Sequence, residues 1–337
     1  MESVALLPDK DRSELFSATA AKRGVVDALI EKDFWVCLVL KEIFETPQLH
    51  DCLLFKGGTC LSKVFGLISR FSEDIDLVLD WRRLGITDEQ AWDPERSATQ
   101  QDKFNEHIDE LGRKYIADEI VPVLSERMAR LTRGRVMLTI DSNDGHVVAV
   151  RYPRAFSTPY LLEYVKLEIG PRASRIPHTT ASIRPYAAQE YPHLFTKPSC
   201  EVKAIVSERS FWEKATILHQ IAFMPERKKL GPRYSRHYYD LYRMRGTNTE
   251  RLALADVTLL EDVAAFKARF YRSPAARYDL ARPGTLKLVP ARQRCDELAL
   301  DYAQMREMIF ADPPAFRAIV DGLQELEVRI NTGGAQP

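Results

Sequence analysis

The sequence has 337 residues, which exceeds the usual size of one domain, so we expect one to three domains and ample material for a core. Its 48 basic and 48 acidic residues cancel, which excludes a protein drawn to nucleic acid by its overall charge and leaves only local patches for that purpose. The five scattered cysteines form no C-x-x-C pair, and neither a signal peptide nor a membrane-spanning run is recognisable, so we expect a cytoplasmic protein without a zinc module.

Helices and then a strand are predicted at the start of the chain. Apolar residues recur at helical spacing over residues 9–23 and 25–44, the second segment containing the run IEKDFWVCLVLKEIF. A short apolar strand at residues 53–55 leads into a glycine pair and an amphipathic helix that we expect to continue to Ile68. A second apolar strand begins at Asp74 with the letters DIDL.

The glycine pair and the acidic strand together indicate a chemistry. Successive strand side chains point to opposite faces, so Asp74 and Asp76 would project from one face, where carboxylates could hold Mg²⁺. Gly57 and Gly58 supply backbone that can approach a phosphate, because no Cβ intervenes. A glycine pair alone is usually a turn and Asp-x-Asp alone is usually a solvated strand end. Their combination in one strand–turn–helix–strand unit indicates metal-assisted chemistry on a nucleoside triphosphate.

The middle of the chain changes from helix to strand. A helical pattern over residues 101–131 ends at Arg133-Gly134, and three runs typical of strands follow at residues 136–140, 147–152 and 160–169. Residues 171–198 are expected to be loops or short elements, and nearly everything from Val206 onward is expected to be helix. The sequence therefore predicts an α+β catalytic domain at residues 1–198 and a helical C-terminal domain at residues 199–337.

The third of these strands adds a candidate ligand. In VKLEIG, Lys166 and Glu168 share one face while the apolar residues share the other. Glu168 could complete a metal site or accept a proton from an attacking hydroxyl. The alternative is a structural glutamate that pairs with Arg151 or Arg172.

Two charged residues stand out in the helical C-terminal part. Lys214 lies near the start of a helix in the segment RSFWEK, and a compact ammonium suits triphosphate oxygens. Asp240 lies among aromatic residues in RHYYDLY, where a lone carboxylate is costly unless it is paired. On residue chemistry alone, Lys214 is most often a solvated helix residue and Asp240 could only orient Arg236.

These motifs, in this order, resemble a known family. Strand, glycine turn, helix and acidic strand follow the order of the polymerase-β-like nucleotidyltransferases. The narrower resemblance is to the AbiEii/AbiGii toxin family, which also contains the mycobacterial MenT toxins. Four motifs carry it, namely EKDFW at 31–35, KGGT at 56–59 with FSEDIDL at 71–77, RSFWEK at 209–214 and RHYYDL at 236–241. Ser210 stands where the family usually has threonine.

The resemblance implies a fold, an activity and partners. The fold is a mixed sheet flanked by helices, followed by a helical C-terminal domain. The activity is transfer of a nucleoside monophosphate from an NTP, with Mg²⁺, or Mn²⁺ in its place, and release of pyrophosphate. Characterised relatives are toxins of bacterial toxin–antitoxin or phage-defence pairs, and the MenT-like ones extend the 3′ end of tRNA. The expected partners are therefore an NTP, an RNA acceptor such as tRNA and a cognate antitoxin, with no membrane.

The resemblance also implies roles for single residues. The expected nucleotide-binding residues are Lys56, Gly57, Gly58, Thr59 and Arg209. The expected metal ligands are Asp74, Asp76 and Glu168. Lys214 would offset charge on the departing pyrophosphate in the same cleft as Asp74, and Asp240 would position Lys214 or the nucleotide.

Local basic stretches are candidates for binding RNA, although such stretches are usually solvated surface. The candidate residues are Arg127, Arg130, Arg133, Arg227, Lys228 and Lys229.

Two other functions remain open at this point. A small-molecule nucleotidyltransferase, such as an antibiotic-modifying enzyme, shares the glycine and Asp-x-Asp core but needs an acceptor pocket instead of basic surfaces. A catalytically silent protein that only binds its antitoxin is the second alternative. The joint presence of both aspartates, Lys214 and Asp240 speaks against the silent protein, because folding alone does not require that set.

Overall fold

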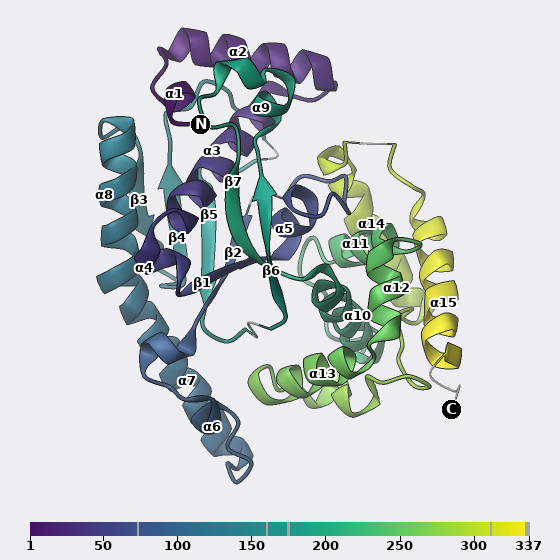
Figure 1. Ribbon diagram of the computed structural model, residues 1–337. Helices are drawn as coiled ribbons and strands as arrows, with labels where there is room; N and C mark the ends of the chain where they lie inside the picture. Colours follow the sequence, from purple (N-terminus) through teal and green to yellow (C-terminus); the bar gives the residue numbers. More distant parts are fainter. Residues whose placement is uncertain (73, 160, 174–175, 311, 334–337) are drawn as a thin grey trace. The chain divides into compact units, whose positions relative to one another are not determined.

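The computed structural model describes residues 1–72, 74–159, 161–173, 176–310 and 312–333, and it has the predicted α+β fold class (Figure 1). The chain divides into two compact units. The first comprises residues 1–64 and 71–205, and the second comprises residues 65–70 and 206–337. The division into a catalytic domain at residues 1–198 and a helical domain at residues 199–337 stays a prediction.

The first unit is built on a mixed seven-stranded sheet in the order β3-β4-β5-β2-β1-β7-β6. The central β2 is antiparallel to β1 and parallel to β5, so the strands that carry the predicted carboxylates are neighbours. The strands are β1 (Leu53–Lys56), β2 (Asp74–Leu79), β3 (Met137–Ile140), β4 (Val147–Arg151), β5 (Val165–Gly170), β6 (His178–Ile183) and β7 (Cys200–Ile205).

Helices cover this sheet, and α3 is the most deeply buried of those in the described part of the unit, lying against β5 and β7 (Figure 1). The helix predicted at residues 9–23 is confirmed as α2. The long helical pattern at 101–131 is confirmed as α7 and α8, which are joined by a π-helical turn at Ile116–Ile120. The α-helices are α1 (Glu2–Ala5), α2 (Asp9–Arg23), α3 (Asp27–Phe44), α4 (Pro47–His50), α5 (Gly57–Lys63), α6 (Asp88–Ala91), α7 (Ala98–Tyr115), α8 (Val121–Thr132) and α9 (Tyr186–Glu190).

Two predicted elements were wrong in extent, and two strands were not predicted. The helix after the glycine pair ends at Lys63 and does not reach Ile68, and the chain turns at Gly66 with φ +62°. The strand predicted from Tyr160 begins at Val165, and Tyr160 itself lies outside the described residues. Residues 171–205 contain β6 and β7, which were not predicted as strands. The edge strand β6 is mostly polar and half-exposed, so it lacks an apolar pattern.

The charged residues at the start of α3 are buried and hold other segments in place. Glu31 accepts hydrogen bonds from two backbone N–H groups of the loop after β4, and Lys32 donates to a backbone carbonyl in the same loop. Asp33 accepts from the Lys63 ammonium at 2.6 Å and from the Tyr186 backbone N–H at 2.7 Å. Burial opposes the charge on Lys63, but Asp33 outweighs it and raises the pKa of the ammonium. This pair therefore ties α5 to α3.

The second unit is helical in its described residues. In it α10 lies against α11, α12 and α13, while α11 also contacts α14 and α15. The α-helices are α10 (Ser207–Phe223), α11 (Ser235–Met244), α12 (Asn248–Ala255), α13 (Thr258–Phe270), α14 (Arg292–Met305) and α15 (Phe316–Gly333). Among all helices that the structure describes, none is both long and apolar enough to cross a membrane.

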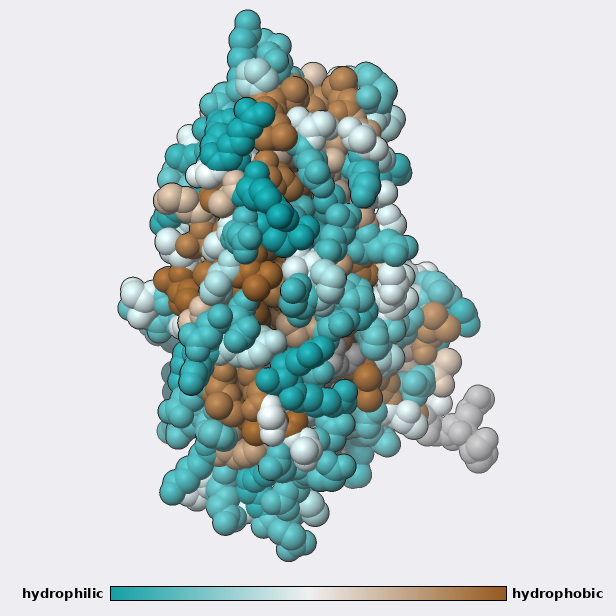
Figure 2. All heavy atoms as spheres, turned by 60° about the vertical axis from the view of Figure 1, so that its left-hand side comes forward, coloured by the Kyte–Doolittle hydropathy of each residue, from teal (hydrophilic) through white to brown (hydrophobic). Residues whose placement is uncertain are grey.

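Hydrophilic residues predominate on the face drawn in Figure 2, and hydrophobic residues show there as separate patches. Exposed large hydrophobic side chains include Met137 and Ile140 on the edge strand β3. Scattered exposure of this kind is ordinary for a protein surface in water.

Replacing Asp33 by asparagine tests the pair that ties α5 to α3. Asp33→Asn leaves the Lys63 ammonium buried without its counter-charge, so we expect the free energy of unfolding to fall by about 3–5 kcal/mol. Urea unfolding followed by circular dichroism measures this. The matched control is Asp321→Asn, which removes an exposed pair with Arg317 and should hardly move the midpoint. Equal midpoints for the two variants would contradict the assignment.

Candidate functional site

The strand register brings the three predicted carboxylates to one face of the sheet. In the register of β2 against β5, Asp76 lies opposite Glu168, and Asp74 lies opposite Lys166. On the other side of β2, Lys56 of β1 is the register partner of Asp76. Paired residues share a face, so all five polar side chains project together, and each is half-buried. The opposite face carries buried apolar residues that belong to the core.

The Asp76 carboxylate packs directly on Gly57, the first residue of α5. A Cβ built on Gly57 would lie 1.8 Å from Oδ2 of Asp76, which is impossible without displacing the carboxylate. Gly57 also has φ +80°, a conformation that residues with a side chain rarely adopt. The glycine motif and the aspartate motif are therefore parts of one packed structure, in which any residue other than glycine would move Asp76.

Thr59 fixes the start of β2 against α5. Its buried hydroxyl donates to the backbone carbonyls of Ser72 at 3.0 Å and Asp74 at 2.5 Å. A hydroxyl has one proton, so in this structure that proton is used to brace β2. The expected contact of Thr59 with a nucleotide stays a prediction. The first backbone N–H groups of α5, from Gly57 onward, have no partner within the helix and remain the candidates for phosphate.

Lys166 is a site residue that the sequence interpretation did not include. Its ammonium is paired with the Glu168 carboxylate. Burial disfavours the charged ammonium, but this hydrogen bond and the charges of Glu168 and Asp74 outweigh it and raise the pKa of Lys166. Arg172, one alternative partner predicted for Glu168, donates to Asp109 at 2.7 Å. The alternation in VKLEIG already placed Lys166 on the acidic face, so the signal for it was present.

The acidic face fits a divalent cation. Asp74 and Asp76 leave one strand on the same side, Glu168 lies beside Asp76, and half-buried carboxylate oxygens are the ligands that Mg²⁺ prefers. The pairing of Glu168 with Lys166 leaves the two aspartates as the main candidates for holding the ion.

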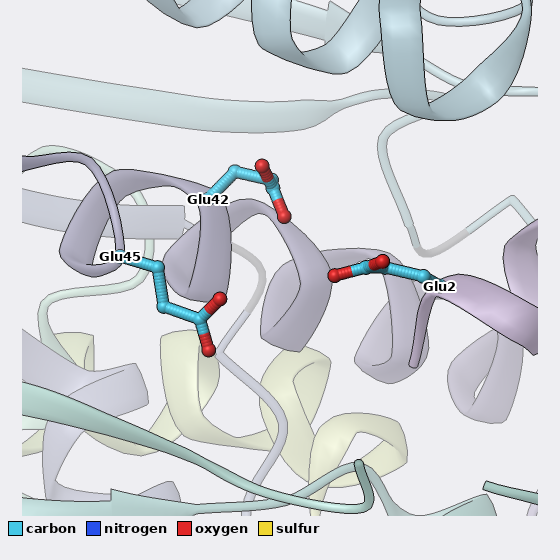
Figure 3. Close-up of side chains that lie close together, drawn as sticks. All are labelled: Glu2, Glu42 and Glu45. Atoms are coloured by element: carbon cyan, nitrogen blue, oxygen red, sulfur yellow. The ribbon is translucent and has the colours of Figure 1, made fainter. Parts of the chain in front are cut away.

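A second acidic cluster in this unit has a different explanation. The carboxylates of Glu2, Glu42 and Glu45 come within 4.8 Å of one another (Figure 3). The Lys41 ammonium lies 2.7 Å from Glu2, 3.0 Å from Glu42 and 2.7 Å from Glu45. Burial disfavours its charge, but the three hydrogen bonds outweigh burial and raise the pKa of Lys41. The lysine thus supplies the cation for this cluster, which we assign to stability.

The second unit has its own charged group, made of Lys214, Asp240 and Arg70. Asp240 is fully buried and accepts from Arg70 Nε at 2.6 Å, from Arg70 Nη2 at 2.7 Å and from the Lys214 ammonium at 2.7 Å. Burial alone would raise the pKa of Asp240, but Arg70 and Lys214 hold it well below its usual range. Burial, together with the charge of Arg70, lowers the pKa of Lys214 although Asp240 opposes the shift. The structure therefore brings together Lys214 and Asp240, as the expected positioning of the lysine requires.

Other residues around this group differ in what the sequence revealed. Arg70 was missed, because it lies in a loop with no helical or strand pattern and reaches Asp240 only through the fold. His237 is half-buried, and burial, together with the charge of Lys214, lowers its pKa well below the usual value. Arg209, an expected nucleotide-binding residue, is buried and donates to Glu213 at 3.2 Å.

The basic candidates for RNA contact fall into two classes. Arg127 donates to the buried Glu42, at 3.1 Å from Nε and 3.0 Å from Nη2, so its charge is balanced within the protein. The other members of the set are exposed, and they are Arg130, Arg133, Arg227, Lys228 and Lys229.

The comparison with protein families points the same way as the motifs. A family model described as "Nucleotidyl transferase AbiEii toxin, Type IV TA system" matches residues 38–322, which is most of the chain. Among solved structures, the chain is similar to MenT4, a nucleotidyltransferase toxin from Mycobacterium tuberculosis H37Rv. The two share 17% sequence identity and a TM-score of 0.45, over 92% of this chain and 98% of that chain. No curated protein sequence matches.

Replacing Gly57 by alanine tests the packing of Asp76. Gly57→Ala should displace the carboxylate and so weaken Mn²⁺ binding strongly, as measured by electron paramagnetic resonance of the free ion. Gly24→Ala is a matched control, because Gly24 has φ +66° but an added Cβ would meet nothing within 4 Å. Both variants carry backbone strain of about 1–2 kcal/mol, so only the clash distinguishes them. The packing would be refuted by equal Mn²⁺ affinity in the two variants.

Replacing Asp240 by asparagine tests the buried charges of the second unit. Asp240→Asn removes the buried negative charge that Arg70 and Lys214 share, and we expect the free energy of unfolding to fall by about 3–5 kcal/mol. The pKa of Asp240 is depressed in the folded state, so its contribution is complete above the unfolded-state pKa. That contribution is lost as the pH falls toward the folded-state pKa, and the gap between wild type and variant should therefore narrow in acid. Chemical unfolding at several pH values measures the gap.

The control for this experiment is Asp279→Asn, which removes an exposed pair with Arg277 and should change stability little at any pH. A gap between wild type and Asp240→Asn that widens in acid would contradict the assigned ionisation.

Proposed function

The chain belongs to the AbiEii family of nucleotidyl transferase toxins, and on this basis we propose that it transfers a nucleoside monophosphate from an NTP to the 3′ end of a tRNA, with Mg²⁺ as cofactor. Membership makes the chain a nucleotidyltransferase and a toxin of a toxin–antitoxin system. The tRNA acceptor, the choice of Mg²⁺, a role in phage defence and a cytoplasmic location belong to the proposal. A cognate antitoxin is the partner that the family implies.

One observation supports the chemistry most directly: the Asp76 carboxylate lies against Gly57, with Asp74 and Glu168 on the same sheet face. The acidic face and the first N–H groups of α5 are thereby held next to each other. A nucleoside triphosphate carries a metal ion on one side of its phosphates and needs hydrogen-bond donors on the other. The arrangement offers both from neighbouring segments.

In the proposed reaction the residues of the acidic face have separate tasks. Asp74 and Asp76 would hold Mg²⁺, which when bound supplies positive charge to the phosphates. Backbone N–H groups of Gly57 and Gly58 bind phosphate oxygens, and Thr59 keeps β2 in place. The acceptor hydroxyl oxygen bonds to the α-phosphorus, the bond from that phosphorus to the bridging oxygen breaks, and pyrophosphate leaves. The Glu168 carboxylate accepts the hydroxyl proton, while Lys166 keeps that carboxylate oriented.

We also propose that Lys214 offsets negative charge on the nucleotide and that Asp240 positions it. The support within the second unit is the 2.7 Å contact between the Lys214 ammonium and the Asp240 carboxylate. Asp240 also accepts hydrogen bonds from Arg70, so the carboxylate that holds the lysine is itself held in place from a second side. A buried ammonium fixed in this way can interact with an anionic ligand without first being reoriented.

The experiment that tests the function incubates the purified protein with each α-labelled NTP in turn, Mg²⁺ and total bacterial RNA. We expect label at the 3′ end of tRNA with one preferred NTP. Label that enters only a small molecule would replace the RNA acceptor by the small-molecule alternative. Absence of transfer with every NTP would contradict the proposal.

The same assay tests the acidic face. Asp74→Asn and Asp76→Asn should each lower transfer by about a hundredfold or more, because metal-assisted charge stabilisation is worth several kcal/mol and about 1.4 kcal/mol is a factor of ten. Both variants should stay folded, since the carboxylates lie on a half-buried face. The control is Glu201→Gln, an exposed carboxylate on β7 of the same sheet, which should transfer normally. Full activity in the aspartate variants would exclude the assigned site.

A further inference from the structure

The second unit contains a large open pocket that none of the motifs identified. It has a volume of about 800 Å³ and lies where α11 ends and α12 begins, beside α15. Four arginines line it, and they are Arg243, Arg245, Arg251 and Arg329. Glu250 is the carboxylate among its described lining residues. We call this feature the arginine pocket.

The charges in the arginine pocket are only partly balanced. Glu250 is engaged by Arg329, at 3.0 Å from Nε and 2.5 Å from Nη2, and it also accepts the Gly246 backbone N–H at 2.5 Å. Arg245 donates to Glu325 at 2.5 Å, a residue outside the lining. Balanced arginines of this kind form the walls of the pocket without attracting a ligand strongly.

Arg243 and Arg251 provide the unbalanced charge. Arg251 donates to the neutral amide oxygen of Asn248 at 2.6 Å, and Arg243 reaches the Ser69 hydroxyl at 3.5 Å. Within the described residues, no carboxylate pairs with either guanidinium. Both side chains are exposed, and α12 begins beside them with the partial positive charge of a helix N-terminus. The pocket therefore presents positive charge that the protein does not balance.

The wall of the arginine pocket is shaped for this arrangement. A Cβ on Gly322 of α15 would lie 1.7 Å from Nη1 of Arg245 and 2.8 Å from Cε2 of Tyr242, so only glycine leaves room for both. The Arg245 guanidinium lies 5.2 Å from the centre of the Tyr242 ring. These contacts hold Arg245 in place, and they occupy one face of the tyrosine ring.

The arginine pocket begins one helical turn from the buried Lys214–Asp240 pair. Arg243 follows Asp240 by three residues on α11, a spacing that places both on the same side of the helix. The Ser69 hydroxyl that Arg243 reaches belongs to the residue before Arg70, which binds Asp240. A chain of phosphates that occupies the pocket would thus lead toward the proposed catalytic lysine.

We propose that the arginine pocket binds the phosphate backbone of the single-stranded end of the RNA acceptor. Guanidinium groups bind phosphate oxygens through two parallel hydrogen bonds, and positive grooves follow the backbone of single strands. A nucleoside triphosphate fits the pocket less well, because the metal ion that it carries needs a carboxylate ligand. The carboxylate in the described lining, Glu250, is already engaged by Arg329. Contacts to phosphate carry no sequence information, so the pocket favours RNA ends of any sequence. The inference rests on the proposed function for the identity of the acceptor.

The test measures binding of a fluorescein-labelled single-stranded RNA oligonucleotide by anisotropy over a range of salt concentrations. The variant Arg243→Gln/Arg251→Gln should bind more weakly, and its slope of log affinity against log salt should be shallower by about 1.4, since each phosphate contact on a single strand contributes about 0.7. Arg317→Gln is the matched control, because Arg317 is an exposed arginine of α15 outside the pocket and pairs with Asp321. Wild-type affinity and slope in the double variant would overturn the proposal.

Two further measurements separate this proposal from the proposed function. NTP affinity of the double variant, measured by calorimetry, should stay near that of wild type, and a loss of NTP affinity with unchanged RNA affinity would overturn the RNA assignment. If wild type labels RNA but the double variant binds RNA normally, only the pocket assignment falls. If wild type labels no RNA but the double variant still loses RNA affinity, the binding of RNA phosphates by the pocket stands, while the proposed function falls and with it the identification of that RNA as the acceptor.

Discussion

The space beside Gly57 can hold only one group, and the Asp76 carboxylate occupies it. This steric constraint fixes the relation between the turn into α5 and the central strand β2. The Thr59 hydroxyl strengthens the same relation from the other side by binding the Asp74 carbonyl. Because β5 runs in register with β2, the position of Asp76 also sets where Glu168 lies. The proposed site is thus the product of one close contact and one strand register.

Buried cations recur in this chain, and their surroundings distinguish them. Lys41 has three carboxylates, and Lys63 is paired with Asp33. In both, these partners outweigh burial and raise the pKa of the ammonium. Lys214 instead shares its carboxylate with Arg70, and its pKa is lowered by burial and by that neighbouring charge. Burial and a neighbouring positive charge disfavour the Lys214 ammonium more than its own carboxylate favours it, and this difference from Lys41 and Lys63 is the physical reason to propose Lys214 for contact with the nucleotide.

The parts of the fold and site that the sequence predicted are those that depend on local periodicity. Helix α2 and the shared face of Asp74 and Asp76 follow from spacings of 3.6 and 2 residues, and both are present in the structure. Arg70 could not be found in this way, because a loop has no periodicity and its partner Asp240 lies 170 positions further along the chain. The reason for glycine at position 57 was likewise hidden, since the group that fills its Cβ space comes from another strand. Strand β7, in contrast, alternates apolar and polar residues, so its sequence does carry the pattern of a strand.

The chain as a whole is neutral, but positive and negative charges are not balanced everywhere locally. Clusters of basic residues in the sequence do not show where the unbalanced charge lies. Arg127 belongs to the first basic stretch, yet it is engaged by Glu42, whose other oxygen binds Lys41. The arginine pocket, by contrast, is assembled from residues at 243, 245, 251 and 329, and a scan for consecutive basic residues does not find it. A polyanion responds to the charge that remains after internal pairing and to the hollow that presents it, not to the number of arginines in a segment. For this chain, internal pairing leaves such charge beside the end of α11, one turn from Asp240 in the same unit, and this remaining charge is what the proposed binding of an RNA end depends on.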